Sequence, residues 1–447
     1  MNETFDLVIK NALALVHKNS TLTQSLVNIG IRAGKIAEIS NTTLEGQEYF
    51  DAKGLHVLPG VIDSQVHFRD PGLTHKETFE TGTKGAALGG VTSVFDMPNT
   101  KPSTSTAELY DEKIKVISPQ AFVNFGVFVG ATPDNFSKLG ALEKMPGCPG
   151  VKIFMGSSTG DLLIPDDETL ERVLKSGNRR VIVHSEDEMR LAERKELAVA
   201  AAHPRFHPEW RDVETAVRST TRLLRASEKT GRAIHVLHIT TAEEMVLLKQ
   251  AKAKRDGHVT VEVLPQHLTL SAPECYERLG SKAQMNPPIR EQRHLEALWK
   301  AIEDGTVDVL GSDHAPHTLE EKAKPYPQSP SGMPGVQTLL PLMLNHVNAG
   351  RLSLERLVEL VCENPRRVFG CRTKGRIEVG LDADFTFVNL TRQERITDSK
   401  IASKCGWTPF DGMIVQGWPV GTMIHGKFVM QDGELIGRPL GKIVEFS

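Results

Sequence analysis

The 447-residue sequence lacks the features that mark secreted, membrane-spanning and nucleic-acid-binding proteins. Its five cysteines are scattered and form no C-x-x-C pair, which is typical of a reducing compartment and predicts no disulfide bonds. No apolar run approaches the roughly eighteen residues of a spanning helix, and residues 1–10 lack the apolar core of a signal peptide. The net charge is −3 without runs of like charge, so neither nucleic acid nor a membrane surface is an expected partner. We therefore expect a cytoplasmic protein that acts on a small molecule.

Strand-type segments gather at both ends of the chain, around a middle that alternates strands and helices. Residues 1–56 contain short β-branched runs separated by turn signals, and residues 374–447 have the same character. The simplest arrangement is a small β-sandwich domain built from both termini, 1–56 plus 374–447. A large α/β domain of residues 57–373 is then inserted between them.

The middle of the chain contains eight candidate strands in succession. They lie at residues 55–67, 91–96, 122–129, 150–155, 180–184, 233–238, 259–264 and 306–310. Apolar residues recur at helical spacing between most of them, for example over 167–174 and 242–249. This order predicts a (β/α)8 barrel, with an open doubly wound sheet as the lesser alternative.

Polar side chains accumulate at the carboxyl ends of these strands, which favours the barrel because a doubly wound sheet concentrates its site at one switch point. The first strand runs into Asp63-Ser-Gln-Val-His-Phe-Arg-Asp-Pro-Gly72. Later strands run into or contain Asn99, Lys152, His184, His238 and the segment Asp313-His-Ala-Pro-His317. Each residue alone has a structural explanation, such as an outward-pointing lysine or a helix cap. In a barrel, however, all of these strand ends converge on one rim.

This set of side chains suits metal-assisted hydrolysis. Imidazole and carboxylate are good zinc ligands, and a bound zinc lowers the pKa of its water to about 7. Two ions about 4 Å apart would need a bridging anionic ligand. Lysine is a poor ligand as an ammonium, but its adduct with CO₂ is a carbamate with two ligand oxygens. The sequence therefore gives a reason for a lysine inside a metal pocket.

At these residues the chain resembles the cyclic amidohydrolases, and within them the dihydroorotases, over almost its whole length. The matching segments are Gln65-Val-His-Phe-Arg-Asp-Pro-Gly72, Asp96-Met-Pro-Asn-Thr100, Gly150-Val-Lys-Ile-Phe154, Val183-His-Ser-Glu-Asp187, Leu237-His-Ile-Thr-Thr241, Asn286-Pro-Pro288, Ser312-Asp-His-Ala-Pro-His317 and Gly406-Trp-Thr-Pro-Phe410. One segment alone is a weak signal, whereas the ordered set is specific. The resemblance implies a barrel with a zinc site at its rim and the reversible closure of N-carbamoyl-L-aspartate to dihydroorotate, a step of pyrimidine synthesis.

The resemblance also implies roles for individual residues. The metal ligands would be His67, Lys152 as a carboxylated bridge between ions, His184, His238 and Asp313, which also serves as general base. The substrate would be held by Arg69, Asn99 and His317 at its free carboxylate, by Asn286 near its ring, and by the backbone of Ser331 and Gly332. Arginine offers a rigid fork of donors that suits a carboxylate. Arg69 therefore favours a dihydroorotase over a dihydropyrimidinase or an allantoinase.

One residue departs from the family pattern. Gln65 stands where the family has the first histidine of a His-x-His pair, and an amide is a weaker zinc ligand than imidazole. One or two zinc ions are therefore both compatible with the sequence. The same departure leaves a second interpretation open, a non-catalytic scaffold for aspartate transcarbamoylase. Analogy with other barrels suggests a homodimer. Residues 318–335 form either a cover over the site or an ordinary surface connection.

Overall fold

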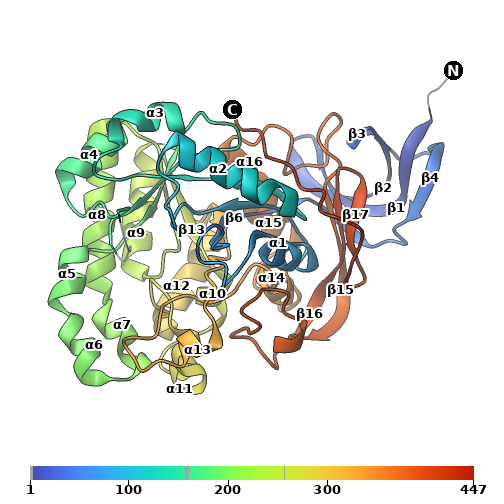
Figure 1. Ribbon diagram of the computed structural model, residues 1–447. Coiled ribbons are helices and arrows are strands. Elements are labelled where there is room, and N and C mark those ends of the chain that lie inside the picture. The colour runs from blue at the N-terminus through green and yellow to red at the C-terminus, as the bar shows by residue number, and fades with distance from the viewer. Residues whose placement is uncertain (1–3, 157–160, 256) are drawn as a thin grey trace.

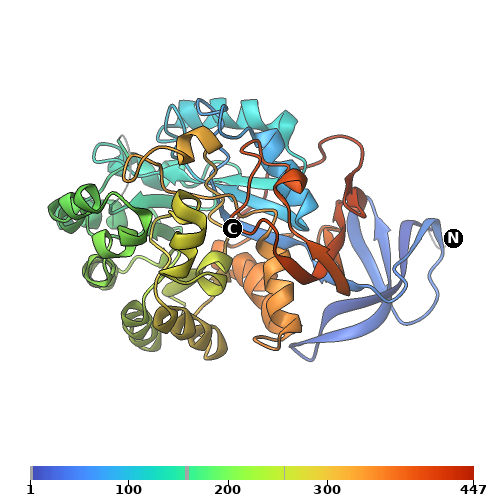
Figure 2. The same cartoon turned by 90° about the horizontal axis from the view of Figure 1, so that it is seen from below.

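The computed structural model describes residues 4–156, 161–255 and 257–447. Over these residues, the two ends of the chain share one sheet of nine strands. Its strands are β1 (Phe5–Lys18), β2 (Thr21–Arg32), β3 (Lys35–Ser40), β4 (Gly46–Asp51), β5 (His56–Pro59), β15 (Phe385–Arg395), β16 (Ile414–Ile424), β17 (Lys427–Gln431) and β18 (Glu434–Leu435). β5 joins the two halves, because it pairs with β1 on one side and with β15 on the other. Figures 1 and 2 both show the blue N-terminal strands beside the red C-terminal strands, at one side of the helix-covered part.

The sheet folds over a core of its own, as a sandwich does. Phe50 of β4 contacts Phe387 of β15 and Phe428 of β17, with ring centroids 5.3 and 4.8 Å apart. β4 belongs to the N-terminal half of the sheet and β15 and β17 belong to the C-terminal half, so these contacts join the two halves. Apolar residues of β1, β2 and β15 fill the space between them.

The middle of the chain forms a closed ring of parallel strands. They are β6 (Val61–Val66), β7 (Val91–Asp96), β8 (Asn124–Val127) continued by β9 (Val129–Gly130), β10 (Val151–Phe154), β11 (Val181–His184), β12 (Ile234–Val236), β13 (Val259–Val263) and β14 (Val309–Leu310). A parallel bridge between Val66 and His314, with the His67 N–H donating to the His314 carbonyl at 2.8 Å, joins the last strand to the first. The predicted (β/α)8 barrel with a small β-sandwich from both termini is confirmed.

Helices follow the strands and cover the outside of the ring (Figure 1). They are α1 (Phe79–Leu88), α2 (Ala107–Ile117), α3 (Leu139–Leu142), α4 (Asp167–Lys175), α5 (Glu188–Glu193), α6 (Lys195–Ala201), α7 (His207–Trp210), α8 (Val213–Thr230), α9 (Ala242–Lys254), α10 (Pro265–Thr269), α11 (Glu274–Leu279), α12 (Gln292–Glu303), α13 (Leu319–Lys322), α14 (Leu339–Asn348), α15 (Leu354–Val358) and α16 (Asn364–Phe369). Among the described residues, no helix is both long enough and apolar enough to cross a bilayer.

The structure corrects the first predicted strand. Residues 55–67 form two strands, β5 in the terminal sheet and β6 in the barrel, separated at Gly60. A Cβ at Gly60 would lie 2.3 Å from Thr92 Oγ1, so only glycine fits where the chain passes from one sheet to the other. A continuous apolar run cannot reveal such a crossing, because both strands are buried. The predicted domain boundaries at residues 56 and 374 stay a prediction.

Aromatic residues close the end of the barrel at which the strands begin. Phe95 packs against Phe369 and Phe446, with ring centroids 5.4 and 5.2 Å apart. Ile62, Phe128 and other apolar side chains complete this plug. The barrel therefore has a packed lower end, and its polar groups gather where the strands end.

Candidate active site

One cavity of about 370 Å³ opens at the carboxyl ends of the barrel strands. The structure places every predicted site residue in its lining: Gln65, His67, Arg69, Asn99, Lys152, His184, His238, Asn286, Asp313, His317, Ser331 and Gly332. Side chains that sequence reasoning left out also line it, among them Phe154, Trp210, Arg211 and Gln284. The barrel thus brings together residues separated by up to 267 positions, although their individual roles stay predictions.

Two histidines from neighbouring strands face one another in this cavity. His184 Nδ1 lies 3.0 Å from His238 Nε2, close to the roughly 3.3 Å that separates two nitrogen ligands of one tetrahedral zinc. Burial lowers the pKa of both imidazoles. Both rings are therefore neutral at pH 7, the form in which imidazole binds a metal.

A buried ion pair fixes the orientation of His184. Its Nε2 lies 2.8 Å from Glu186 Oε2, and Arg211 donates to the same carboxylate through Nε and Nη2 at 3.0 and 2.6 Å. Burial alone would raise the pKa of Glu186, but the Arg211 guanidinium and His184 outweigh it and hold that pKa well below the usual range. The ionised carboxylate accepts a hydrogen bond from the Nε2–H group, so the unprotonated Nδ1 is the atom that faces His238.

Lys152 contributes an amine to the same cavity. Lys152 is 1% exposed, and its Nζ has no hydrogen-bond partner among the described residues. Burial lowers the pKa of Lys152 to about 7, against the opposing effect of Asp313 and Glu262. A large fraction of the side chain is therefore the free amine at neutral pH, which is the form that reacts with CO₂.

Asp313 contacts two side chains at the end of β6, the first strand of the barrel. Its Oδ1 accepts from Gln65 Nε2 at 3.0 Å and lies 3.1 Å from His67 Nε2. His67 Nδ1 lies 2.7 Å from Asn99 Oδ1. Among the described residues, no three His, Cys, Asp or Glu side chains form a metal-binding group by themselves. A third ligand at either histidine would have to come from another residue type. Lys152 Nζ and Gln65 Oε1 both belong to the cavity lining and have no hydrogen-bond partner among the described residues.

One end of the cavity is strongly cationic. Arg69 is 8% exposed, and its closest polar contacts are the Pro316 carbonyl at 3.4 Å and His317 Nε2 at 3.5 Å. Lys76 Nζ lies 3.1 Å from His317 Nδ1. Burial, followed by the charges of Arg69, Lys76 and Lys322, holds the pKa of His317 far below its usual value. His317 is therefore a neutral side chain in a positive environment.

Three of these residues have a backbone conformation that L-residues rarely adopt. The φ angles are 61° at Arg69, 38° at His238 and 44° at Asp313. A positive φ outside glycine costs about 1–3 kcal/mol and persists only where the surrounding structure imposes it. All three residues follow the end of a barrel strand, so the strained backbone turns their side chains into the cavity.

Comparison with known proteins identifies the family. Residues 56–429 match the model described as the Amidohydrolase family. The chain belongs to the amidohydrolase family. A dihydroorotase of Methanothermobacter thermautotrophicus is 37% identical over 418 residues, 92% of each chain. The resemblance to the cyclic amidohydrolases drawn from the sequence is thereby confirmed, and as a member of this family the chain is a hydrolase of amide bonds.

Other relatives of this amidohydrolase carry other names. An L-hydantoinase of Paenarthrobacter aurescens is 34% identical and covers 98% of both chains, and an allantoinase of Deinococcus radiodurans is 33% identical and covers 99% of both. A solved L-hydantoinase (dihydropyrimidinase) from Arthrobacter aurescens superposes with a TM-score of 0.93 at 32% identity, over 99% of this chain and 100% of that one. Overall similarity therefore fixes the family, and the substrate has to be argued from the site.

The sequence analysis of this amidohydrolase did not identify the residues that hold other site residues in place by hydrogen bonds. Glu186 follows His184, the last residue of β11, by two positions. A carboxylate this close to a candidate ligand histidine is a signal that could have identified it. Arg211 and Gln284 reach the site from connections between strands, where no periodicity indicates their direction. Only the folded chain shows them.

The segment 318–335 is partly a wall of the site. It begins with the short helix α13, and its residues 327–332 line the cavity. Thr318 and Glu321 cap this helix reciprocally, each side chain bonded to the backbone of the other. The T-x-x-E spacing of Thr318 and Glu321 is the sequence signature of such a cap.

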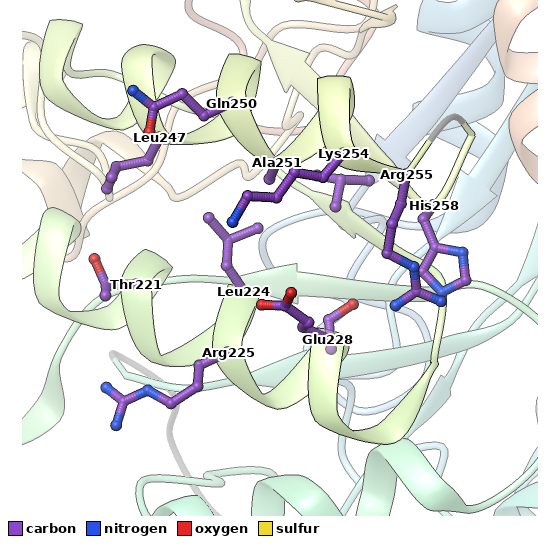
Figure 3. Close-up of a pocket in the computed structure, with 12 residues that line it drawn as sticks. Thr221, Leu224, Arg225, Glu228, Leu247, Gln250, Ala251, Lys254, Arg255 and His258 are labelled. Atoms are coloured by element: carbon purple, nitrogen blue, oxygen red, sulfur yellow. The ribbon is translucent and has the colours of Figure 1, made fainter.

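A second cavity, of about 240 Å³, lies between α8 and α9 on the outside of the barrel. Leu224 and Ala251 lie between the two helices, with Glu228, Lys254 and Arg255 around them (Figure 3). None of the predicted site residues lines this cavity. The candidate site of this amidohydrolase is therefore the cavity at the strand ends, where all of the predicted site residues lie.

Proposed function

We propose that this amidohydrolase is a zinc-dependent dihydroorotase. It would catalyse the reversible cyclisation of N-carbamoyl-L-aspartate to (S)-dihydroorotate in pyrimidine biosynthesis. The observation that carries the proposal is Arg69, a buried guanidinium that faces the cavity and forms no ion pair with any carboxylate of the described residues. A buried charge requires a partner, and the carboxylate of dihydroorotate would supply one.

The surroundings of Arg69 support an anionic ligand. Lys76 and Lys322 add positive charge near His317, and Glu321 pairs with Lys76 at 3.0 Å, outside the cavity lining. Dihydropyrimidines and hydantoins carry no carboxylate that would use this end of the cavity. The hydantoinase and allantoinase readings therefore remain alternatives that leave Arg69 without a partner.

The donor set fits a metal at the histidine pair. His184, His238 and a carbamate on Lys152 would hold it, with Glu186 fixing the first of these ligands. Bound zinc would polarise the amide carbonyl and lower the pKa of a water molecule. His67 and Asp313 offer a further pair of ligands, where Gln65 hydrogen-bonds to the carboxylate.

Asp313 is the group that would move the proton. Its carboxylate lines the cavity and is held by hydrogen bonds from the first strand. In the hydrolytic direction Asp313 would accept a proton from the attacking water and deliver it to the departing ring nitrogen. In the cyclisation direction it would remove the proton from the carbamoyl nitrogen.

The test of this function is hydrolysis of dihydroorotate, followed by loss of ring absorbance, on protein whose zinc content is measured in the same sample. We expect turnover of dihydroorotate and little turnover of dihydrouracil or hydantoin. Faster hydrolysis of the rings without a carboxylate would reassign the substrate. No turnover of any ring by zinc-loaded, bicarbonate-treated protein would favour the scaffold for aspartate transcarbamoylase.

The number of ions can be tested at Gln65. Replacing Gln65 with histidine restores an imidazole beside His67 and Asp313, so we expect bound zinc to rise by up to one ion per chain. The measurement is elemental analysis of the dialysed wild-type and Gln65→His proteins. An unchanged zinc-to-protein ratio would argue against a metal role for position 65.

The carboxylate behind His184 should control metal affinity. Glu186→Gln replaces the ionised carboxylate that fixes the His184 tautomer with a neutral amide, which is a weaker acceptor. Loss of such a support typically weakens metal binding about 10- to 100-fold. Competition with a chelator would measure the zinc affinity of the folded variant. Glu244→Gln is the matched control, because Glu244 is equally buried but bonds to Thr220 and Thr241 instead of a histidine. Equal affinities in the two variants would contradict the role given to Glu186.

A further inference from the structure

A buried lysine stands behind the cavity wall. Lys322, the last residue of α13, is 2% exposed. Its Nζ donates to three backbone carbonyls, those of Pro330 at 2.8 Å, Gly332 at 3.0 Å and Gln284 at 3.1 Å. An ammonium has three N–H donors, so each of them has an acceptor.

This arrangement is unusual for a lysine. Lysine is almost never fully buried unless it is paired, and among the described residues no carboxylate forms an ion pair with Lys322. Hydrogen bonds from a charged donor are stronger than those from a neutral donor. Burial lowers the pKa of Lys322 to about 7. In the ammonium form the three carbonyls take the place of a counter-ion, and the hydrogen bonds of Nζ tie two separate segments to one point.

Lys322 and Gln284 hold the same stretch of chain. The Gln284 side chain donates to the Ser329 carbonyl at 2.8 Å and to Ser331 Oγ at 3.1 Å, and it accepts from Ser329 Oγ at 2.7 Å. The Gly332 N–H donates to the Gln284 carbonyl at 2.9 Å. Residues 329–332 are thus fixed through their carbonyls at 329, 330 and 332.

The fixed stretch also contacts the cationic end of the cavity. The remaining carbonyl, that of Ser331, lies 3.0 Å from His317 Nε2. The backbone of His317 is held in turn, since Trp407 Nε1 donates to its carbonyl at 2.8 Å. Ser331, Gly332 and His317 all line the cavity, so a shift of the wall would displace His317 from Arg69.

We propose that Lys322 is a positioning residue for the substrate. It holds residues 329–332 as a fixed wall of the cavity, so that Ser331 and Gly332 keep a constant position against the ring of the ligand and His317 stays beside Arg69. The wall does not open and close as a lid. This inference deepens the proposed dihydroorotase function and rests on it for the identity of the substrate.

The test compares Lys322→Met with Lys324→Met. Methionine keeps the apolar stem and removes the three donors, while Lys324 is an exposed lysine of the same segment. We expect Lys322→Met to raise KM for dihydroorotate at least tenfold with kcat within threefold of wild type. We also expect hydrogen exchange of the Gly332 amide to accelerate at least tenfold, while the amides of the barrel strands exchange as before. Lys324→Met should change neither quantity.

Two results would overturn the inference. The first is a folded Lys322→Met protein with wild-type KM and wild-type exchange at Gly332. The second is a uniform acceleration of exchange across the barrel, which would make Lys322 a general stability residue. If the methionine variant does not fold, Lys322→Gln, which retains two donors, is measured in its place against the same criteria. A wild-type protein that hydrolyses no dihydroorotate would refute the proposed function, and the exchange experiment would still decide whether Lys322 fixes the wall.

Discussion

Asp313→Asn is expected to lower kcat for dihydroorotate hydrolysis by at least about 100-fold, because general acid–base catalysis typically contributes 10²- to 10⁴-fold. Asparagine has nearly the shape of aspartate and still offers an oxygen to Gln65 Nε2, but it cannot accept the proton of the attacking water. The rate of cyclisation of N-carbamoyl-L-aspartate should fall by the same factor, because both directions pass through the same transition state.

Two comparisons make the Asp313 result specific. Asp304→Asn is the control, since Asp304 is exposed at the end of α12, which precedes β14, and pairs with Lys249 away from the cavity. Zinc content is measured on each protein so that a lost proton acceptor is not confused with a lost ion. A variant that keeps its zinc and more than a tenth of wild-type kcat would remove Asp313 from the role of general base.

Arg69→Met should change which ring the enzyme prefers. The variant loses the charged hydrogen bonds to the substrate carboxylate, and bonds of this kind are worth about 1.5–3 kcal/mol, or roughly 10- to 100-fold. We therefore expect kcat/KM for dihydroorotate to fall about 100-fold, while kcat/KM for dihydrouracil, which lacks the carboxylate, stays within threefold. Arg69→Lys should lie between wild type and Arg69→Met, because lysine keeps the charge but not the planar fork.

The change in kcat/KM for dihydroorotate, compared with the change in kcat/KM for dihydrouracil, decides the interpretation of Arg69. A selective loss for dihydroorotate assigns the guanidinium to the carboxylate. An equal loss for both rings would mean that Arg69 supports the site in another way, for example through its contact with the Pro316 carbonyl or its strained backbone. The solvent-exposed Arg293, which pairs with Glu243 on the outside of the barrel, offers a control position for removal of an arginine.

The sequence carried enough information to predict the barrel and the lining of its cavity. His67, His184 and His238 each lie at or just after the end of an apolar strand, and Lys152 lies inside one. A barrel brings such strands together whatever their separation along the chain. The position of each polar residue relative to its strand predicted the cavity lining, and strand limits can be recognised from the local pattern of apolar residues. The break at Gly60 could not be predicted from the local pattern. Two buried strands on either side of the crossing have the same composition as one long strand.

The supporting contacts could not be predicted in the same way. Lys322 and Gln284 act through backbone carbonyls, and a carbonyl leaves no trace in the residue type that carries it. The strained conformations of Arg69 and Asp313 are likewise imposed by neighbours that are distant in sequence. Residues that touch a ligand are recognisable from their chemistry, whereas residues that hold others in place are recognisable only from their contacts.

The pairing of β5 with β15 joins two parts of the sheet that are synthesised at different times. The first half of the sheet emerges from the ribosome more than 300 residues before its other half. Until then β5 presents an unpaired edge, and exposed edges of this kind promote aggregation. A nascent chain that stalls after the barrel would therefore contain the complete set of cavity residues from the strands and still expose the edge of β5, which has no partner until β15 is made.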